Sequence, residues 1–264
     1  MGAAMVEGLT ISGWPVERIH VGDPDGGKRL QMESRFGVRA YAANRDAVRD
    51  ADLIILACKP ALAIPICQEF APVLSLSTIV VSCCAGVPSA VLRRTLGLER
   101  PLIRIMPNTA VAMGQGAIGL YADEDIEPNS IASVSSIFDR LGIVCRVDDE
   151  TLLDAVIALS GSGPAYFFLL MEAMIDSAVS IGMNPDNARR MAVQTALGAA
   201  RLAARSACSP AELRKQVATP GGTTEQALNM LERHGFRKAV AEAMFSAKER
   251  AALIAEQIET ESKV

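Results

Sequence analysis

The stretch ADLIILACKP, residues 51–60, places a continuous apolar run directly before Lys59 and Pro60. TIVVSCCAG, residues 78–86, repeats this arrangement, and PLIRIMPN follows at residues 101–108. Continuous apolar runs separated by helical stretches are typical of parallel strands that are buried on both faces. Right-handed crossovers would join these strands into a doubly wound sheet. We therefore predict an α/β domain over residues 1–149, with further strands at 19–21 and 143–147 and helices at 28–36 and 131–141.

From residue 150 onward the pattern changes to successive Ala-, Leu- and Met-rich helical segments, so we predict an all-α domain over residues 150–264. Asn184 and Ser209 each precede a proline, which is typical of an N-cap followed by the first helical residue. The predicted helix at 165–181 is apolar on nearly every face and must be buried on most of them. A domain of this size has little core to cover it, which favours a homodimer over a self-contained bundle.

Composition excludes several classes of protein. The chain has 264 residues, a net charge of −4 and no basic cluster, so we expect no nucleic-acid partner. We find no apolar run of membrane-spanning length and no secretory leader, which predicts a cytoplasmic protein without a membrane anchor. The six cysteines form no CxxC pair and only two histidines are present, so we expect reduced thiols and no metal site.

Four segments follow predicted strands and would meet at one edge of the sheet. They are Asp23-Pro24, the run from Ala57 to Pro60, Cys84-Ala85-Gly86, and the run from Met106 to Thr109. Ligands of open α/β sheets bind at the carboxyl ends of the strands, and small residues there allow close approach to the backbone. Each segment alone is explained by ordinary turn chemistry, but the four together predict a bound nucleotide.

Two more segments carry chemical signals. In TPGGTTEQAL, residues 219–228, Gly221 and Gly222 form a turn with exposed N–H groups, and Thr223 or Thr224 can cap the helix that follows. Such a helix N-terminus attracts a carboxylate, although a plain helix cap explains the same residues. In SGSGPAY, residues 160–166, small residues before a proline predict close packing or a hinge between domains.

The order of CKP, SCCAGV, RIMPNTA, LSGSGPAYFF, QTALGAA and ATPGGTTEQAL resembles the pyrroline-5-carboxylate reductase family over nearly the whole chain. The resemblance implies a Rossmann-like domain, a helical domain that interlocks in a dimer, and reduction of a cyclic imine to L-proline with NADPH or NADH. It also implies that the Rossmann-like domain of one subunit meets the substrate loop of the other.

The resemblance assigns roles to individual residues. The loop after Ala218 would hold the substrate carboxylate, and the hydroxyl of Thr224 would donate a hydrogen bond to the ring nitrogen. The substrate-binding residues expected are Thr219, Gly221, Gly222, Thr223 and Thr224, with Thr219 standing where relatives usually have serine. It places Asn44, Lys59, Pro60, Ala85 and Asn108 at cofactor contacts. With the strand-end residues Asp23, Ala57, Cys58 and Gly86, and with Gly2, these are the cofactor-binding residues that we expect.

Asp23 bears on the choice of cofactor. An acidic side chain at the end of this strand favours the ribose hydroxyl of NADH and repels the 2′-phosphate of NADPH. Lys28 and Arg29 lie nearby in sequence and act in the opposite sense. On balance we expect a slight preference for NADH.

The chain opens with MGAAMVEGLTISGW, residues 1–14, which predicts a helix with Gly13 at its C-terminal end. Relatives begin with a strand and a GxGxxG loop, and Gly2 aligns with the third glycine of that loop. The first strand and the two earlier glycines are therefore expected to be missing. We favour a misassigned start over a truncated version or a naturally short protein. Because the missing strand is central, its neighbours would lose hydrogen bonds.

Two other interpretations stay open. Another NAD(P)-dependent reductase of the same plan, such as a β-hydroxyacid dehydrogenase, would need a catalytic lysine in a long central helix. No lysine occurs between Thr151 and Arg214, which argues against it. The other interpretation is a cofactor-impaired dimer with no catalytic role. The intact loop from Pro220 to Thr224 argues against it.

Overall fold

The computed structural model describes residues 1–261 of the chain. It forms two compact units, Met1–Pro164 with Ser246–Val264, and Ala165–Phe245. The boundary between the units follows Pro164 and not residue 149, where we expected it. Residues 150–164 and the end of the last helix pack with the first unit.

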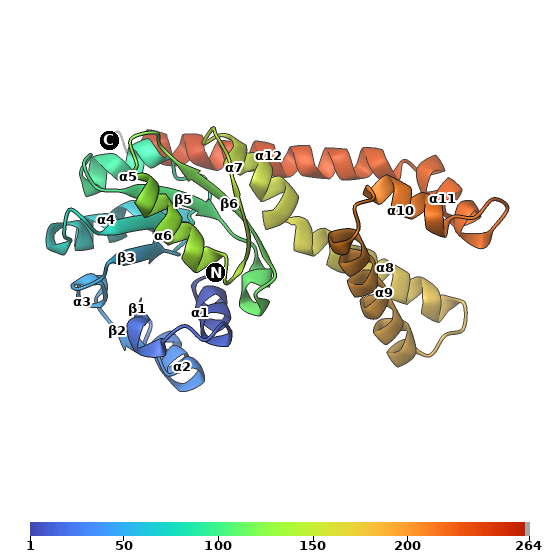
Figure 1. Cartoon of the computed structure of the whole chain (residues 1–264), viewed down its shortest axis with the longest axis horizontal. Coiled ribbons are helices and arrows are strands. Elements are labelled where there is room, and N and C mark those ends of the chain that lie inside the picture. Colours follow the sequence, from blue (N-terminus) through green and yellow to red (C-terminus); the bar gives the residue numbers. More distant parts are fainter. Residues whose placement is uncertain (262–264) are drawn as a thin grey trace. The chain divides into compact units, whose positions relative to one another are not determined.

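The first unit contains a five-stranded sheet in the order β3 (Leu53–Leu56), β4 (Ile79–Ser82), β5 (Leu102–Met106), β6 (Gly116–Ala122) and β7 (Gly142–Arg146) (Figure 1). Strands β3, β4 and β5 are parallel, as the three apolar runs predict. Strand β6 was not predicted, and it runs antiparallel to β5. The connection from β5 to β6 contains only a short 3₁₀ helix, Thr109–Met113. A parallel partner would need a longer crossover connection, so the chain returns antiparallel to β5.

Two short strands form a separate parallel pair, β1 (His20–Gly22) and β2 (Arg39–Tyr41) (Figure 1). Within residues 1–261, neither strand pairs with the five-stranded sheet, and β3 has only β4 as a partner. In the part of the chain that the structure describes, β3 is therefore an edge strand of its sheet, and β1 and β2 have only each other as partners.

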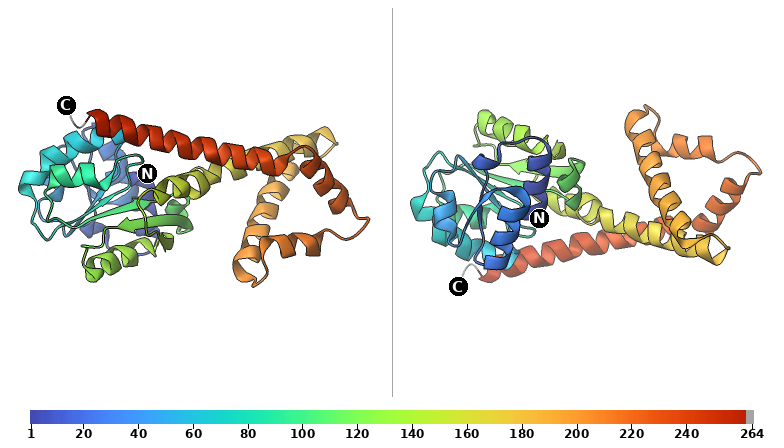
Figure 2. Two further views of the ribbon diagram at one scale, coloured as in Figure 1. Left: turned by 90° about the horizontal axis from the view of Figure 1, so that it is seen from above. Right: turned by 90° about the horizontal axis from the view of Figure 1, so that it is seen from below.

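Helices cover both faces of the five-stranded sheet, which confirms the doubly wound Rossmann-like plan. One core cluster joins the sheet to α1 (Gly2–Ile11), α2 (Gly26–Phe36) and α6 (Pro128–Phe138). The other joins it to α4 (Ala63–Phe70), α5 (Ser89–Leu96) and Ile258 near the end of α12 (Phe236–Glu261) (Figure 2). Gly8 of α1 is required for this packing, because a Cβ there would lie 2.1 Å from the carbonyl oxygen of Val111.

Local signals set the helix ends of this unit. The Asp25 carboxylate caps α2 by accepting from the N–H groups of Gly27 and Lys28, and these bonds lower the pKa of Asp25. The helix ends at Gly37, whose φ of 72° is left-handed. Short helical segments complete the unit: Val16–Arg18, α3 (Asn44–Val48), Pro60–Leu62, Ala71–Val73, α7 (Leu152–Val156) and the π-helical turn Ile157–Gly161.

The second unit is entirely helical in the residues described. It contains α8 (Gly163–Ser180) from Ala165 onward, α9 (Pro185–Arg205), α10 (Pro210–Val217), α11 (Thr223–Arg233) and the first part of α12. The predicted caps are confirmed: Asn184 accepts from two N–H groups at the start of α9, and Ser209 forms a reciprocal capping box with Glu212.

The apolar helix α8 is not covered within one chain. Phe167, Phe168 and Leu169 are each more than 60% exposed. Residues Leu152–Ser180 form one helical stretch of 29 residues, and its most apolar window has a mean hydropathy of 1.4. By length and composition alone, this stretch is long and apolar enough to cross a membrane. The expectation that no run reaches this length is therefore wrong, because helix continues through the π-helical turn into α8.

Candidate active site

The start of α1 lies beside the end of β3. Met1 is the N-cap and provides no side-chain hydrogen bond, and the first turn holds no acidic residue. The positive end of the helix dipole is therefore unneutralised by side chains of its first turn. A Cβ on Gly2 would lie 3.6 Å from the Cβ of Ala57, so the structure brings these two predicted cofactor residues together.

Asp23 and Asn44 lie at the ends of β1 and β2. The N–H of Asp23 donates to the carbonyl of Tyr41 at 3.1 Å, and Lys28 Nζ lies 3.9 Å from Asp23 Oδ2. Asn44 begins α3 and donates from its backbone and side chain to the carboxylate of Glu69, at 2.9 and 2.7 Å. A Cβ on the adjacent Gly22 would lie 2.7 Å from Asn44 Oδ1, so a larger residue there would make the Asn44 side chain shift.

The ends of β3 and β4 carry the next group of predicted residues. Lys59 precedes the turn that starts at Pro60, and its carbonyl accepts from the N–H of Leu62 at 2.9 Å. The sulfurs of Cys58 and Cys84 lie 3.6 Å apart, which brings the two loops into contact.

Ala85 and Gly86 complete the loop after β4. Gly86 has a φ of 68°, and a Cβ there would lie 2.7 Å from Ile254 of α12. Both its conformation and its close packing therefore require glycine. Asn108, at the end of β5, is buried, and its Oδ1 accepts from the N–H groups of Ala110 and Ala117 at 3.3 Å each.

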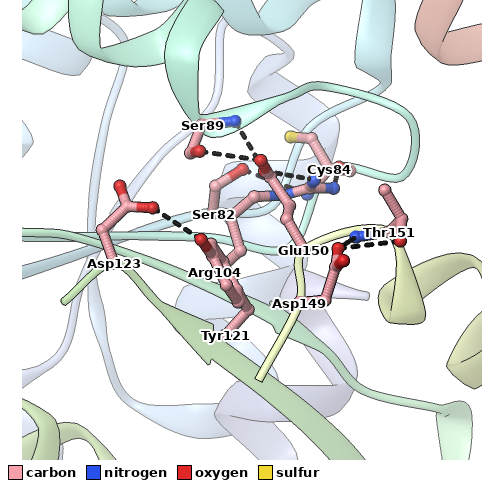
Figure 3. Close-up of polar contacts among 9 residues, drawn as sticks. All are labelled: Ser82, Cys84, Ser89, Arg104, Tyr121, Asp123, Asp149, Glu150 and Thr151. Carbon is pink, nitrogen blue, oxygen red and sulfur yellow. Dashed lines mark hydrogen bonds and ion pairs between the residues drawn. The ribbon is translucent and has the colours of Figure 1, made fainter. Parts of the chain in front are cut away.

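A buried polar network holds the loop after β4 in place (Figure 3). Arg104 on β5 donates from Nη1 to Glu150 Oε1 at 2.7 Å and from Nη2 to the carbonyl of Cys84 at 3.2 Å. The Glu150 carboxylate also accepts from the N–H of Ser89 at 2.6 Å and from its hydroxyl at 2.8 Å. One ion pair thus fixes both the loop and the start of α5.

Tyr121 and Asp123 flank this network on β6 and the segment after it (Figure 3). The Tyr121 hydroxyl donates to Asp123 Oδ1 at 2.7 Å. Burial, and then this hydrogen bond, raise the pKa of Tyr121 to about 12. The phenol therefore stays protonated and acts as a fixed donor at neutral pH.

Sequence reasoning did not single out Arg104, Glu150 or Ser89. The available signal was Arg104 itself, the one charged residue within the otherwise apolar β5. A charge in a strand buried on both faces needs a partner, but the pattern does not say which carboxylate supplies it.

The residues at this edge fit a nicotinamide dinucleotide. The uncapped N-terminus of α1 and the Lys59 ammonium suit a diphosphate, and the small residues Ala57 and Ala85 leave room beside the strand ends. The structure brings together Gly2 with Ala57 and Cys58 with the loop that leads to Gly86. The side-chain amide oxygen of Asn108, by contrast, already accepts hydrogen bonds from two backbone N–H groups.

The second unit contains the glycine loop, residues 219–222, directly before α11. Gly221 has a φ of 73°, and its N–H donates to Glu225 Oε2 at 2.8 Å. The N–H of Gly222 donates to the carbonyl of Thr219 at 3.0 Å, and a Cβ on Gly222 would lie 2.6 Å from Thr219 Oγ1.

The expectation that Thr223 or Thr224 caps the following helix is wrong. Gly222 is the N-cap of α11 and no side chain caps it, so both threonines lie in the first turn with their hydroxyls free of that role. The exposed N–H expected at Gly221 is also occupied by Glu225. The N–H groups of the first turn lack partners within the helix, and Glu225 supplies a carboxylate in the same turn.

The segment SGSGPAY lies at the junction of α7 and α8. Ser160 and Gly161 belong to the π-helical turn, and the Ser160 hydroxyl donates to the carbonyl of Val156 at 3.0 Å. Such turns are rare in helices and frequent at functional sites. Whether the segment acts as a hinge stays a prediction.

Comparison with known proteins assigns the chain to a family. Residues 150–254 match the family model described as pyrroline-5-carboxylate reductase dimerisation, and residues 1–86 match NADP oxidoreductase, coenzyme F420-dependent. The pyrroline-5-carboxylate reductase of Pseudomonas aeruginosa is 41% identical over 258 residues, which cover 98% of this chain and 94% of that protein. The chain belongs to the pyrroline-5-carboxylate reductase family.

Other members support the same assignment. The Escherichia coli reductase is 36% identical, with 95% of this chain and 93% of that protein covered. The solved Coxiella burnetii reductase matches with a TM-score of 0.88 and 35% identity, covering 96% and 94% of the two chains. The Plasmodium falciparum enzyme, solved with NADP bound, has a TM-score of 0.87 and 26% identity, covering 97% and 94%. These relatives do not favour the dehydrogenase or the scaffold interpretation.

Proposed function

We propose that this chain reduces the C=N bond of L-1-pyrroline-5-carboxylate to L-proline with NADPH or NADH. The observation that carries the proposal is the glycine loop at the start of α11, where unpartnered N–H groups of a first helical turn lie beside two threonine hydroxyls. This arrangement suits a small ligand that has a carboxylate next to a ring nitrogen.

The chain's own residues position the substrate rather than supply a strong acid. The bound nicotinamide supplies a hydride to the imine carbon. The first turn of α11 would hold the carboxylate, and the Thr224 hydroxyl would donate a hydrogen bond to the ring nitrogen. Because the product amine is strongly basic, a hydroxyl or a water suffices as the proton source, and positioning supplies most of the rate enhancement.

Replacing Thr224 tests this role. We expect Thr224→Ala to lower kcat by roughly 10- to 1,000-fold, because one positioned hydrogen-bond donor is lost. The measurement is the steady-state oxidation of NADH and NADPH with pyrroline-5-carboxylate as substrate. Thr260→Ala, at an exposed threonine near the end of α12, is the matched control and should keep the parent rate. Parent kinetics in the Thr224 variant would contradict the assignment of Thr224.

We further propose a slight preference for NADH, set by Asp23. Its carboxylate lies at the end of β1, with Lys28 Nζ 3.9 Å away as a weak counter-charge. We expect Asp23→Asn to raise kcat/KM for NADPH relative to NADH by about 10-fold, because it removes the repulsion of the 2′-phosphate. Asp46→Asn, at an exposed aspartate of α3, is the control. A parent enzyme that favours NADPH would overturn the proposed preference.

We also propose that the enzyme works in the cytoplasm as a homodimer. Support for the dimer comes from the exposed apolar surface of α8 and the match of residues 150–254 to the dimerisation family model. The six cysteines, all free thiols in the structure, support a reducing compartment.

A further inference from the structure

Cys58 and Cys84 lie side by side at the ends of neighbouring strands. The register of β3 and β4 ends with Leu56 paired to Ser82, and each cysteine lies two residues beyond the end of its strand. Their sulfurs are 3.6 Å apart, in hydrogen-bond contact. A disulfide bond needs the two sulfurs at about 2 Å, so a modest movement of the two loops would allow the bond to form.

The faces of the sheet distinguish this pair from the other thiols. Cys58 and Cys84 pack against the core cluster of α4 and α5, whereas Cys83 packs against the opposite cluster. Cys58 is partly exposed and gives solvent access, while Cys84 is almost fully buried. All six thiols of the chain are free in the structure.

The chemistry of the two sulfurs differs. The hydrogen bond between the two sulfurs lowers the pKa of the Cys84 thiol, and the same contact raises the pKa of Cys58. The nearby Arg104 guanidinium, which binds the Cys84 carbonyl at 3.2 Å, also favours the Cys84 thiolate. By contrast, burial raises the pKa of Cys83 and of Cys67 to about 12. Thiolates, not thiols, react with oxidants.

We propose that Cys58 and Cys84 are a modification site at which a peroxide joins the two sulfurs in a disulfide, and that this bond blocks dinucleotide binding. The second part rests on the proposed function. In the reaction one sulfur is oxidised to a sulfenic acid with release of one water, and the other thiol displaces the second water as the S–S bond forms. Two S–H bonds and the peroxide O–O bond break, and the peroxide oxygens are reduced.

The consequence for the cofactor follows from the positions of the loops. The sulfurs must approach from 3.6 Å to about 2 Å, which pulls the loop at Lys59 and the loop at Ala85 toward each other. Both loops are predicted to bind the dinucleotide. Disulfide and cofactor should therefore exclude each other, so bound NAD(P)H should protect the pair from oxidation.

The cross-link can be located by peptide mapping. The full chain is treated with hydrogen peroxide, remaining thiols are alkylated, and the protein is digested without reductant. Trypsin leaves all four candidate cysteines on one peptide, because Lys59 precedes a proline and the next basic residue is Arg93. Cleavage after Glu69 separates Cys58 and Cys67 from Cys83 and Cys84. We expect a linked peptide pair that dithiothreitol separates.

Variants assign the link to two sulfurs. Cys58→Ser and Cys84→Ser should each abolish the linked pair, whereas the matched controls Cys67→Ser and Cys83→Ser should retain it. A link that survives in Cys58→Ser or Cys84→Ser, or no link in the parent protein, would overturn the site. Circular dichroism of each variant before oxidation verifies that the fold is kept.

Cofactor binding is read separately by NAD(P)H fluorescence titration. Oxidation should weaken binding by about 10-fold or more, and dithiothreitol should restore it. A cross-linked protein that binds NAD(P)H as tightly as the reduced one would overturn the blocking role. A reduced protein that binds no dinucleotide would contradict the proposed function, whereas the mapping result still decides the disulfide site.

Discussion

Arg104 shows how much one residue can organise at the sheet edge. Its guanidinium is 7% exposed and binds a carboxylate that lies 46 residues away in sequence, together with the carbonyl of Cys84. Through Glu150 it also reaches Ser89 at the start of α5 (Figure 3). The Nε of Arg104 has no hydrogen-bond partner, so the hydrogen bonds of Nη1 and Nη2 alone offset the free energy of desolvating the buried charge.

We expect Arg104→Met to lower the free energy of unfolding by about 2–4 kcal/mol, because it leaves the Glu150 carboxylate without its cation and frees the Cys84 carbonyl. Urea denaturation followed by circular dichroism measures the loss. Arg39→Met, at an exposed arginine of β2, is the matched control and should change stability by no more than about 0.5 kcal/mol. Equal effects for the two variants would show that the network adds little stability.

At the scale of elements, the paired strands β1 and β2 are the weakest part of the first unit. They span three residues each, and within the described chain no further strand pairs with either. Two-stranded ladders are marginal in water, and this one is held mainly by α2 and α3. Strand β4, in contrast, lies between β3 and β5, and Val80 and Val81 are fully buried.

We therefore expect backbone amides of β1 and β2 to exchange with deuterium at least about 10-fold faster than those of β4. Hydrogen exchange with mass spectrometry on the parent chain measures this difference. Amides of β4 serve as the internal reference, since their bonds open only with the whole sheet. Equal protection of the two regions would show that β1 is held more firmly than its pairing suggests.

At the scale of the whole molecule, the helical unit carries too much exposed apolar surface for a single chain. Only 17% of the most apolar window in Leu152–Ser180 is buried, and Phe167, Phe168 and Leu169 are largely exposed. The same residues lie within the match to the dimerisation family model. Burial against a second copy accounts for a composition that would otherwise suit a membrane.

We expect Phe168→Asp to convert the proposed dimer to a monomer at micromolar concentration, because a charge would be buried in an apolar interface. Light scattering after size-exclusion chromatography measures the molar mass. Leu30→Asp, at an exposed leucine of α2 with similar exposure, is the control and should stay dimeric. A Phe168→Asp protein that remains a dimer would place the interface on another surface.

Much of the fold was determined by the sequence alone, because the signals are local. The apolar runs before Lys59 and at residues 78–84 require burial on both faces, and they became β3 and β4. Gly37, Asn184 and Ser209 end or begin helices through their own backbone or side-chain chemistry. The order of motifs was sufficient to predict the family, since it extends over nearly the whole chain.

The tertiary structure alone decided which distant groups meet. It set the antiparallel direction of β6, gave the cap of α11 to Gly222 instead of a threonine, and, within residues 1–261, left β1 and β3 unpaired on one side. It also paired Arg104 with Glu150 and placed the sulfurs of Cys58 and Cys84 in contact. Periodicity and propensity report on neighbours along the chain, whereas these contacts depend on strand order and register, which arise when the whole sheet is assembled.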